Sequence, residues 1–374
     1  MQVHPCREPN PVHGHAPLPH TCRIDCGDGP HLLMNVLVIG GAGFIGGHVV
    51  AHHLDKGDAV TILDNLSRKG TVSIAERLRA RGAKIVQADI RRDQDILDRT
   101  IAAAELVYHL AGQVAVTTSV KDPRHDFDTN ALGTFNILEA MRACGSKAPF
   151  LYASTNKVYG KMTDLRIVER DNRYAYADKP NGIAEDYPLE FHSPYGCSKG
   201  TGDQYVHDYH RIYELNTVVF RQSCIYGTHQ FGIEDQGWVA WFAIASAYGK
   251  PITIYGDGKQ VRDVLFIDDL LAAYDAAVAS IETTAGKVYN IGGGPDFTMS
   301  LLDLLALLEK DLGREIPATF SEWRPGDQRV YVSDVGRARA DFEWGPVTKP
   351  DEGVRKLLEW ALANEALIRD VGLI

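Results

Sequence analysis

A tyrosine and a lysine four residues apart are the clearest candidates for chemistry in this sequence. Tyr195 and Lys199 form a Y-x-x-x-K pattern at the start of a predicted helix, where one turn brings both side chains to the same face. A nearby ammonium and the positive charge of the group that accepts the hydride favour a phenolate, so together they are expected to lower the pKa of the Tyr195 phenol toward neutrality. Such a phenol can take a proton from a substrate hydroxyl while hydride leaves the same carbon.

Two hydroxyl side chains precede this pair and are expected to share its site. Ser154 and Thr155 stand at the end of the apolar stretch FLYAS, which is predicted to be a strand. Ligands of open parallel sheets bind at the carboxyl ends of the strands. We therefore expect Thr155 to act with Tyr195 and Lys199, and Ser154 to lie beside the group that accepts the hydride.

The segment GGAGFIG is predicted to bind a pyrophosphate. Gly40, Gly43 and Gly46 follow the apolar run VLVI and open a predicted helix that includes Phe44 and Ile45. Small residues let the turn pass close to a pyrophosphate, and the N-terminus of a helix offers free N–H groups and partial positive charge. A strand, this turn and a helix together indicate a dinucleotide-binding β-α-β unit.

Polar residues after the second and third predicted strands indicate which dinucleotide is bound. Asp64 ends the second strand, where an acid binds the hydroxyls of the adenine ribose. Its carboxylate would repel a 2′-phosphate, so NAD is favoured over NADP, although Arg68 close by weakens that preference. Asn65 is a further candidate contact. Asp89 and Ile90 follow the third strand and are expected to flank the adenine, with a helix cap as the alternative role of Asp89.

Short apolar runs alternate with helical stretches and would position these residues. Continuous apolar strands separated by helices indicate an α/β fold with a doubly wound parallel sheet covered on both faces. The predicted strands are Val36–Ile39, Val60–Leu63, Lys84–Gln87, Leu106–Leu110, Phe150–Ser154 and Thr217–Phe220, and the main predicted helices are Phe44–Leu54, Asp126–Cys144 and Lys199–Tyr213.

The rhythm changes after about residue 225, which predicts a second, smaller lobe. We expect a dinucleotide-binding part over residues 34–225 and a mixed α/β substrate-binding lobe over residues 226–374. The runs VLFI and VYNI, within residues 262–292, are expected to return as strands to the first part. Residues 1–33 lack any helical or alternating period, so they are interpreted as a disordered tail or as sequence upstream of a natural start at Met34.

Composition narrows the classes of function. The 374 residues carry a net charge of -10, which argues against nucleic acid as the main partner. No apolar run reaches the roughly 18 residues of a membrane helix, and no metal site is indicated. Six scattered cysteines suit a reducing cytoplasm.

The motifs together resemble the extended short-chain dehydrogenase/reductase family, the NAD-dependent epimerases and dehydratases of nucleotide-sugars. The resemblance runs from Met34 to the C-terminus and is carried by GGAGFIG, LDN, HLAGQ, ASTNKVYG, SPYGCSK and VRDV. It implies that Thr155, Tyr195 and Lys199 are the catalytic hydroxyl, tyrosine and lysine. It also implies that Leu110, Ala111 and Gln113 line the NAD site, that Asn130 supports the site, and that the chain forms dimers or tetramers.

A subset of motifs is similar to one subfamily, the 2-epimerases of CDP-activated sugars. STNKVYG, DKPNG, HSPYGCSKG, DQGW and GKQVRDV carry this likeness, as does the long insert from Lys161 to His192. The resemblance implies an enzyme that holds NAD tightly and inverts carbon 2 of a sugar, with CDP-paratose and CDP-tyvelose as the implied pair.

The residues after Thr155 argue against the dehydratases of the family. Those enzymes carry an Asp-Glu pair there for removing water, whereas this chain has Asn156 and Lys157, which cannot supply that acid and base. A substrate-touching asparagine of the UDP-galactose 4-epimerases is matched here by Cys224. Another NAD-dependent epimerase, acting at carbon 2 or carbon 4 of a GDP- or UDP-hexose, stays open, as do a net dehydrogenase or reductase and a cofactor-binding regulator.

Candidate residues for gripping the nucleotide-sugar lie in the second half of the chain. Arg262 and Arg324 are candidates for the diphosphate, because guanidinium binds phosphate oxygens in a bidentate fork. Asp327 would then take a ribose hydroxyl. The alternative for Arg262 is a salt bridge with Asp263 or Asp268. Asn156, Cys224, Trp238 and Tyr255 complete the predicted substrate contacts, although isolated aromatic residues more often belong to the core.

Overall fold

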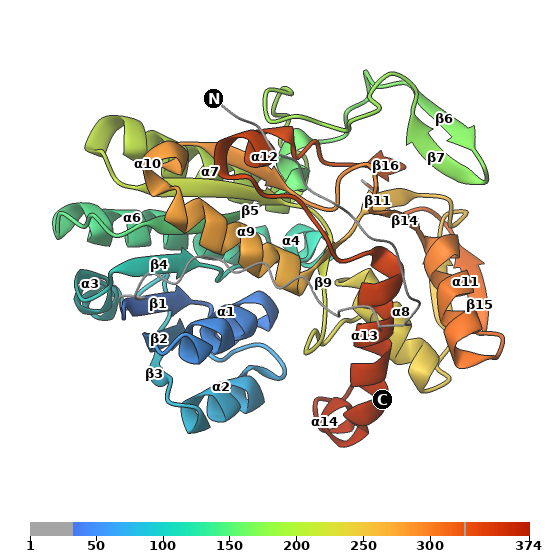
Figure 1. The fold of residues 1–374 in the computed structure, drawn as a ribbon, viewed down its shortest axis with the longest axis horizontal. Helices are drawn as coiled ribbons and strands as arrows, with labels where there is room; N and C mark the ends of the chain where they lie inside the picture. Colours follow the sequence, from blue (N-terminus) through green and yellow to red (C-terminus); the bar gives the residue numbers. More distant parts are fainter. Residues whose placement is uncertain (1–32, 325–326) are drawn as a thin grey trace, which may run out of the picture. The chain divides into compact units, whose positions relative to one another are not determined.

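A computed structural model describes residues 33–324 and 327–374 of the chain (Figure 1). Residues 33–374 form one compact unit. The tail predicted for residues 1–33 lies outside the described residues, apart from Leu33. The predicted division at residues 225 and 226 falls inside the compact unit and stays a prediction about binding roles.

Seven parallel strands form the central sheet, in the order β13-β8-β5-β4-β1-β2-β3. The predicted doubly wound parallel sheet is thereby confirmed. The strand order reverses between β1 and β4, and their carboxyl ends open a crevice suited to a ligand. The strands are β1 (Asn35–Ile39), β2 (Ala59–Asp64), β3 (Lys84–Gln87), β4 (Leu106–His109), β5 (Phe150–Thr155), β8 (Thr217–Gln222) and β13 (Val288–Ile291).

Helices cover both faces of the sheet, because successive side chains of each strand point to opposite sides. In β1, Val36 and Val38 belong to one apolar cluster, whereas Leu37 and Ile39 belong to another. The first cluster includes α1 (Phe44–Asp55), α2 (Thr71–Ala80) and α9 (Ile267–Ala279), and the second includes α3 (Gln94–Ala102), α6 (Gly133–Ala143) and α7 (Ser193–Tyr213).

Two helices differ from their predicted bounds in ways that matter for the site. The helix predicted over Asp126–Cys144 is divided into α5 (Pro123–Phe127), the π-helical turn η1 (Asp128–Leu132) and α6. Asn130 lies in η1, and π-helical turns are frequent at functional sites. Helix α7 begins at Ser193, earlier than predicted, because Pro194 occupies a first-turn position that tolerates proline.

Small sheets and further helices build the second part of the unit. Strand β9 (Ile225–Tyr226) pairs with β12 (Leu265–Phe266), β10 (Ile252–Tyr255) pairs with β15 (Ala318–Ser321), β11 (Val261–Asp263) lies between β14 (Thr298–Ser300) and β16 (Val330–Tyr331), and β6 (Ile167–Arg170) pairs with β7 (Arg173–Tyr176). The remaining helices are α4 (Val116–Lys121), the 3-10 turn η2 (Asn156–Tyr159), α8 (Trp238–Ala247), α10 (Ile281–Thr284), α11 (Leu301–Leu312), α12 (Gly336–Phe342), α13 (Pro350–Ala363) and α14 (Glu365–Asp370).

One of the two predicted return strands is wrong. VYNI, which is β13, joins the central sheet beside β8. The run VLFI instead forms the short β12, which pairs with β9 outside that sheet. Helix α9 follows β12 directly, so the run ends after two paired residues.

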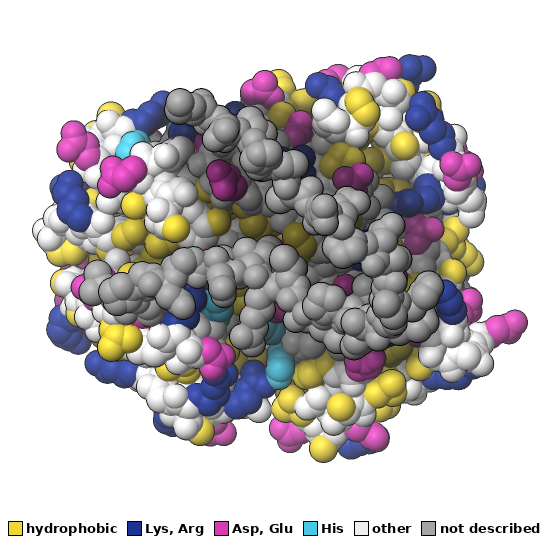
Figure 2. Space-filling view, in the orientation of Figure 1, with side chains coloured by type: hydrophobic (Ala, Val, Ile, Leu, Met, Phe, Trp, Pro, Cys, Tyr) yellow, Lys and Arg dark blue, Asp and Glu magenta, His cyan; other side chains and the backbone are white. Residues whose placement is uncertain are grey.

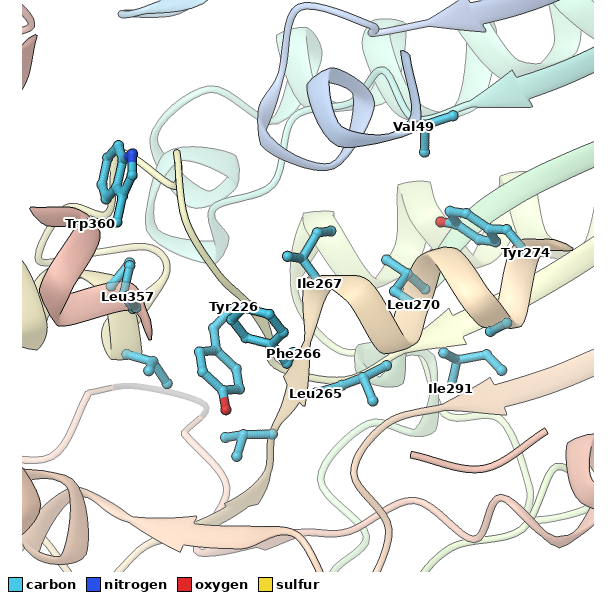
Figure 3. Packing of buried hydrophobic residues seen from close by; sticks show 14 of the residues in the cluster. Val49, Tyr226, Leu265, Phe266, Ile267, Leu270, Tyr274, Ile291, Leu357 and Trp360 are labelled. Atoms are coloured by element: carbon cyan, nitrogen blue, oxygen red, sulfur yellow. The ribbon is translucent and has the colours of Figure 1, made fainter. Parts of the chain in front are cut away.

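A single apolar cluster joins the central sheet to the second part of the unit. Figure 3 shows Ile267, Leu270 and Tyr274 of α9 beside Ile291 of β13, with Leu357 of α13 farther along. These side chains belong to one buried cluster. Close packing of one continuous core resists relative movement, which fixes the geometry of the clefts described below.

Charged side chains of both signs lie interspersed on the described surface of the face drawn in Figure 2. Alternating signs produce a weak field over a surface. None of the helices within 33–324 and 327–374 combines the length and apolar character needed to cross a lipid bilayer.

Candidate active site

Two adjoining cavities open at the carboxyl ends of the central strands. The first has a volume of about 270 Å³ and is lined from β1, β2, β3 and β4, and the second has a volume of about 440 Å³ and is lined from β5, β8 and the second part of the unit. Val114 and Gln236 line both cavities, so a ligand in one can meet a ligand in the other.

The glycine turn forms the floor of the first cavity. Gly40 has a φ of +84°, and a Cβ atom there would lie 2.4 Å from the backbone nitrogen of Ala111. Gly40 and Gly43 line the cavity. Gly46 does not, but a Cβ at Gly46 would lie 2.1 Å from the carbonyl oxygen of Gly40, so its role is to let α1 pack against the turn. These positions leave room for a pyrophosphate at the helix N-terminus.

Asp64 is fixed at the rim of this turn by two backbone N–H groups. Its Oδ2 accepts a hydrogen bond from Ala42 at 3.1 Å and its Oδ1 accepts one from Leu66 at 2.9 Å. Burial raises the pKa of the Asp64 carboxyl, and these hydrogen bonds oppose that rise. Each oxygen keeps lone-pair capacity for a further donor, as the ribose-binding role requires.

The residues predicted around the adenine also line the first cavity. Asn65 and Ile90 lie in its wall, and Asp89 is held there by Arg91, whose guanidinium donates at 2.6 Å and 2.9 Å. Those hydrogen bonds lower the pKa of the Asp89 carboxyl. The alternative role of Asp89 as a helix cap is wrong, because the N-cap residue of α3 is Asp93.

Arg68 and the loop after β4 close the first cavity. Arg68 donates to Oε1 of Gln236 at 2.5 Å, which links the two parts of the unit. Leu110, Ala111 and Gln113 line the cavity as predicted. Asn130 does not line it: its side chain accepts from the backbone nitrogen of Gln113 at 2.9 Å and donates to the Gln113 carbonyl at 3.0 Å. Asn130 therefore positions the loop.

The second cavity begins with the hydroxyl groups expected to do chemistry. Ser154, Thr155 and Tyr195 all line it, together with Phe44 and Ile45 from the start of α1. Tyr195 sits in the first turn of α7 and is buried, and its phenol is hydrogen-bonded to the Thr155 hydroxyl. The predicted hydroxyl–tyrosine pair is thus assembled in the wall of the second cavity.

Lys199 follows Tyr195 by about one turn of α7 and does not line either cavity. Its ammonium donates to the carbonyl oxygen of Ala153 at 2.5 Å and lies 4.3 Å from the centre of the Tyr152 ring. Burial lowers the pKa of Lys199 to about 7, although the nearby carboxylates of Asp203 and Asp126 oppose that change.

The residues around Tyr195 do not by themselves lower the pKa of its phenol. Burial raises the pKa of the Tyr195 phenol to about 12, and the hydrogen bond with Thr155 only partly offsets this effect. The ammonium of Lys199 is engaged by a backbone carbonyl, and its own charged form is disfavoured by burial. The phenol is therefore neutral at pH 7 unless a bound ligand adds positive charge.

Asn156 and Lys157 extend the wall of the second cavity from η2. Asn156 is buried, and its Oδ1 accepts from the Thr155 hydroxyl at 3.4 Å. The ammonium of Lys157 donates to Oε1 of Gln328 at 3.0 Å. An amide and an ammonium therefore stand where a dehydratase of this type would need two carboxyl groups.

Arg262 and Asp327 meet in the second cavity as an ion pair. The guanidinium of Arg262 donates to Oδ1 of Asp327 at 2.7 Å, and both residues line the cavity. Among the described residues Arg262 pairs with Asp327 and with neither of its predicted alternative partners, Asp263 and Asp268. The pair combines the residues predicted for a diphosphate and for a ribose.

The other predicted substrate residues line the same cavity. Arg324 pairs with Asp235 at 3.1 Å and lies 4.0 Å from the centre of the Tyr255 ring. Trp238 begins α8, and Cys224 lies between β8 and β9, where burial raises the pKa of its thiol. An unreactive neutral thiol fits a packing role better than that of a nucleophile.

Several cavity residues were not predicted from the sequence. Ser67, Thr71, His125 and Gln236 line the first cavity, and Gln222, Gln230 and Gln260 line the second. Gln236 stands inside the DQGW motif. Gln260 stands two residues before Arg262, and residues at this spacing share a face of an extended chain, so Gln260 could have been suggested from the sequence.

Unsatisfied acceptors indicate that the second cavity takes a polar ligand. Oε1 of Gln230 and Oε1 of Gln260 are buried and lack a partner among the described residues. Their amide nitrogens are engaged, donating to the carbonyls of Ile225 at 3.2 Å and Tyr255 at 2.7 Å. Buried acceptors of this kind normally bind donors, such as the hydroxyl or amino groups of a ligand.

Comparison with known proteins agrees with this arrangement. Residues 36–292 match the model of the NAD dependent epimerase/dehydratase family. The chain is 43% identical to a CDP-paratose 2-epimerase of Salmonella typhi over 87% of this chain and 99% of the relative. It is 32% identical to a dTDP-glucose 4,6-dehydratase of Neisseria gonorrhoeae over 88% of this chain and 96% of that enzyme. A UDP-glucose 4-epimerase of Thermus thermophilus, solved with NAD, has a TM-score of 0.75 and 30% identity over 88% of this chain and 100% of that one.

Proposed function

Because the chain belongs to the NAD-dependent epimerase/dehydratase family, we propose that it inverts carbon 2 of a CDP-activated sugar, interconverting CDP-paratose and CDP-tyvelose. The chain is an NAD-dependent nucleotide-sugar epimerase by that membership and by its 43% identity to the Salmonella typhi enzyme. The choice of carbon 2 as the inverted carbon and of CDP as the nucleotide is what we propose beyond that class.

The observation that carries the proposal is that Tyr195 and Thr155 line the second cavity, which adjoins the first through the shared residues Val114 and Gln236. The first cavity fits NAD through the glycine turn and Asp64, and the second offers cations and unsatisfied acceptors to a nucleotide-sugar. Asn156 and Lys157 give no carboxyl groups for dehydration. Oxidation and reduction of one carbon are the reactions that the residues around Tyr195 can support.

In the proposed mechanism Tyr195 carries the proton. The phenolate of Tyr195 takes the proton of the carbon 2 hydroxyl, and Thr155 orients that hydroxyl through its own hydrogen bond. Bound NAD supplies the oxidising chemistry at carbon 2 and the reducing chemistry that reverses it. Lys199, about one turn further along α7, would stabilise the phenolate once a ligand excludes water and adds positive charge. Tyr195 then returns the proton to the inverted sugar.

Two features support a CDP-sugar. Gln230 and Gln260 present amide oxygens, which pair with N–H or O–H donors, and both the amino group of cytosine and sugar hydroxyls are such donors. The relative that acts on CDP-paratose covers nearly the whole fold. Arg262, Arg324 and Asp327 are proposed to bind the diphosphate and ribose, which requires Arg262 to give up part of its pairing with Asp327.

The test is the fate of the hydrogen on carbon 2. CDP-paratose that carries deuterium at carbon 2 is incubated with the enzyme in ordinary water, without added NAD. We expect the inverted product to keep deuterium at carbon 2, because a hydride returns to the carbon it left. Loss of deuterium to solvent would indicate deprotonation instead. Inversion at carbon 4 with no change at carbon 2 would disprove the proposed substrate and reaction, but it would be consistent with the family assignment.

The compartment, the assembly and the binding regions of the chain are also part of the proposal. We propose a cytoplasmic homo-oligomer in which residues 34–225 hold the cofactor and residues 226–374 hold the sugar nucleotide. Cys144, Cys197 and Cys224 are free thiols, which suits a reducing compartment. Exposed apolar side chains on α5, α6 and α7 support association with a second copy.

A further inference from the structure

Lys157 is a cation built into the sugar end of the second cavity. It follows Thr155 by two residues in the η2 turn after β5, and it lines the cavity with Thr155 and Tyr195. Its ammonium donates to Oε1 of Gln328 at 3.0 Å, and Nε2 of Gln328 donates to the carbonyl of Gly160 at 2.5 Å. Because an ammonium has three donor hydrogens, this anchor leaves capacity for a ligand.

The charges around Lys157 add up to an excess of positive charge. Three groups act on its ammonium: Arg262 from β11, Asp327 from the segment before β16, and Cys224 from between β8 and β9. Burial, and then Arg262, lower the pKa of Lys157 to about 8, whereas Asp327 opposes this. Two cations share one carboxylate, so an anion in the cavity would be drawn between them.

The position of the reacting carbon decides where an anion must lie. Carbon 2 of the sugar is bonded to the anomeric carbon, which carries the diphosphate, whereas carbon 4 is on the opposite side of the ring. When carbon 2 faces Tyr195 and Thr155, the sugar-proximal phosphate must lie beside that pair. A cation next to Tyr195 and Thr155 could then bind that phosphate directly. If carbon 4 faced Tyr195 instead, the phosphate would lie on the far side of the sugar ring from the cation.

We propose that Lys157 binds the sugar-proximal phosphate of the substrate and thereby holds carbon 2, rather than carbon 4, against Tyr195. This inference rests on the proposed function. It gives Lys157 a binding role beyond those of Arg262 and Arg324, and it assigns Gln328 the task of holding the lysine in place.

The first test compares two probes that differ by one phosphate. Binding of CDP and of CMP is measured for the NAD-loaded enzyme and for Lys157→Met. We expect the substitution to weaken CDP binding about 10- to 100-fold, the range of one charge-assisted hydrogen bond, and to leave CMP binding unchanged. Lys161→Met is the matched control, since Lys161 is an exposed lysine four residues further on, and it should not alter either affinity.

The second test uses the pH dependence of CDP binding. The pKa of Lys157 is about 8, so wild-type affinity should fall as the pH rises through 8 and the ammonium loses its proton. In Lys157→Arg the cation persists at higher pH, and the fall should disappear while part of the affinity is restored. A purely structural lysine would not produce this change in the pH profile.

Three results would overturn the inference. They are unchanged CDP binding in Lys157→Met, an equal loss for CDP and CMP, and a loss of turnover with CDP affinity intact. Retained NAD and an unaltered melting temperature in Lys157→Met show that the variant is folded. The deuterium experiment on the wild-type enzyme judges the proposed function separately, so a failure of the proposed function can be told apart from a failure of the role of Lys157.

Discussion

At the scale of single residues, the environment of Tyr195 differs most from the expectation raised by its motif. The Y-x-x-x-K spacing contributed to the prediction of a lowered phenol pKa. In the structure, burial raises the pKa of Tyr195 to about 12 and lowers the pKa of Lys199 to about 7. Both groups are thus held in their neutral forms more strongly than in water. Spacing along a helix reports which face two residues share, but not how much water surrounds them.

Replacement of Tyr195 by phenylalanine should nearly abolish turnover. The phenol would be the proton-transfer group, and such groups contribute about 100- to 10000-fold. Affinity for CDP should stay near that of the wild type, because the phosphate and base contacts do not involve the phenol. Wild-type turnover should also rise with pH, since the phenolate is the reactive form and its fraction grows toward the pKa of the bound state. Near-normal turnover in Tyr195→Phe would remove Tyr195 from the mechanism.

At the scale of elements, the junction between β1 and α1 depends on the absence of side chains. Gly40 takes a left-handed conformation, and a Cβ at Gly46 would lie 2.1 Å from the carbonyl oxygen of Gly40. That oxygen belongs to the backbone of the turn and cannot move aside as a side chain can. The close approach of helix and turn is what brings the N–H groups of α1 to the first cavity.

The substitution Gly46→Ala should therefore displace α1 and weaken NAD binding. We expect a loss of about 1–3 kcal/mol in the free energy of unfolding, the usual cost of overpacking, with less NAD retained after purification. Thermal melting and assay of the released nucleotide measure both. Gly47→Ala in the same helix is the control, because a Cβ there would meet only side-chain carbons, of Ile74 at 3.1 Å and of Leu78 at 4.0 Å. Equal effects of the two substitutions would refute this account.

At the scale of the whole molecule, the described chain exposes large apolar side chains on neighbouring helices. The exposed fractions are 52% for Phe127, 38% for Phe135, 44% for Tyr205 and 62% for Ile212. These residues belong to α5, α6 and α7, and α7 contacts both other helices. Large apolar side chains gathered on adjacent elements are typical of a protein interface.

We therefore expect the full chain to be a dimer or tetramer through this surface, and Tyr205→Lys to shift it toward the monomer. A charge buried in an interface without a partner is strongly unfavourable. Light scattering after size-exclusion chromatography measures the mass of each form. Val347→Lys is the control, because Val347 is 77% exposed and lies outside these helices. A wild-type monomer, or an assembly that Tyr205→Lys leaves intact, would contradict the prediction.

Much of the fold followed from local pattern. Apolar runs marked all seven strands of the central sheet within two residues at each end, and the glycine turn and Asp64 marked the first cavity. These features depend on neighbours in the chain, so hydrophobic periodicity and short spacings are enough to find them. The same reasoning failed for VLFI, because its pairing with β9 depends on where the second part of the unit packs.

The sheet, the glycine turn and the proposed hydroxyl, tyrosine and lysine could all be predicted from short patterns in the chain. Three contacts became known only from the folded chain: the pairing of Arg262 with Asp327, the contact of Asn130 with a loop instead of a cavity, and the position of Lys157 beside Thr155 and Tyr195. Each of these contacts joins residues from different elements or depends on enclosure from water. Long-range packing sets both, and no short pattern in the sequence encodes it.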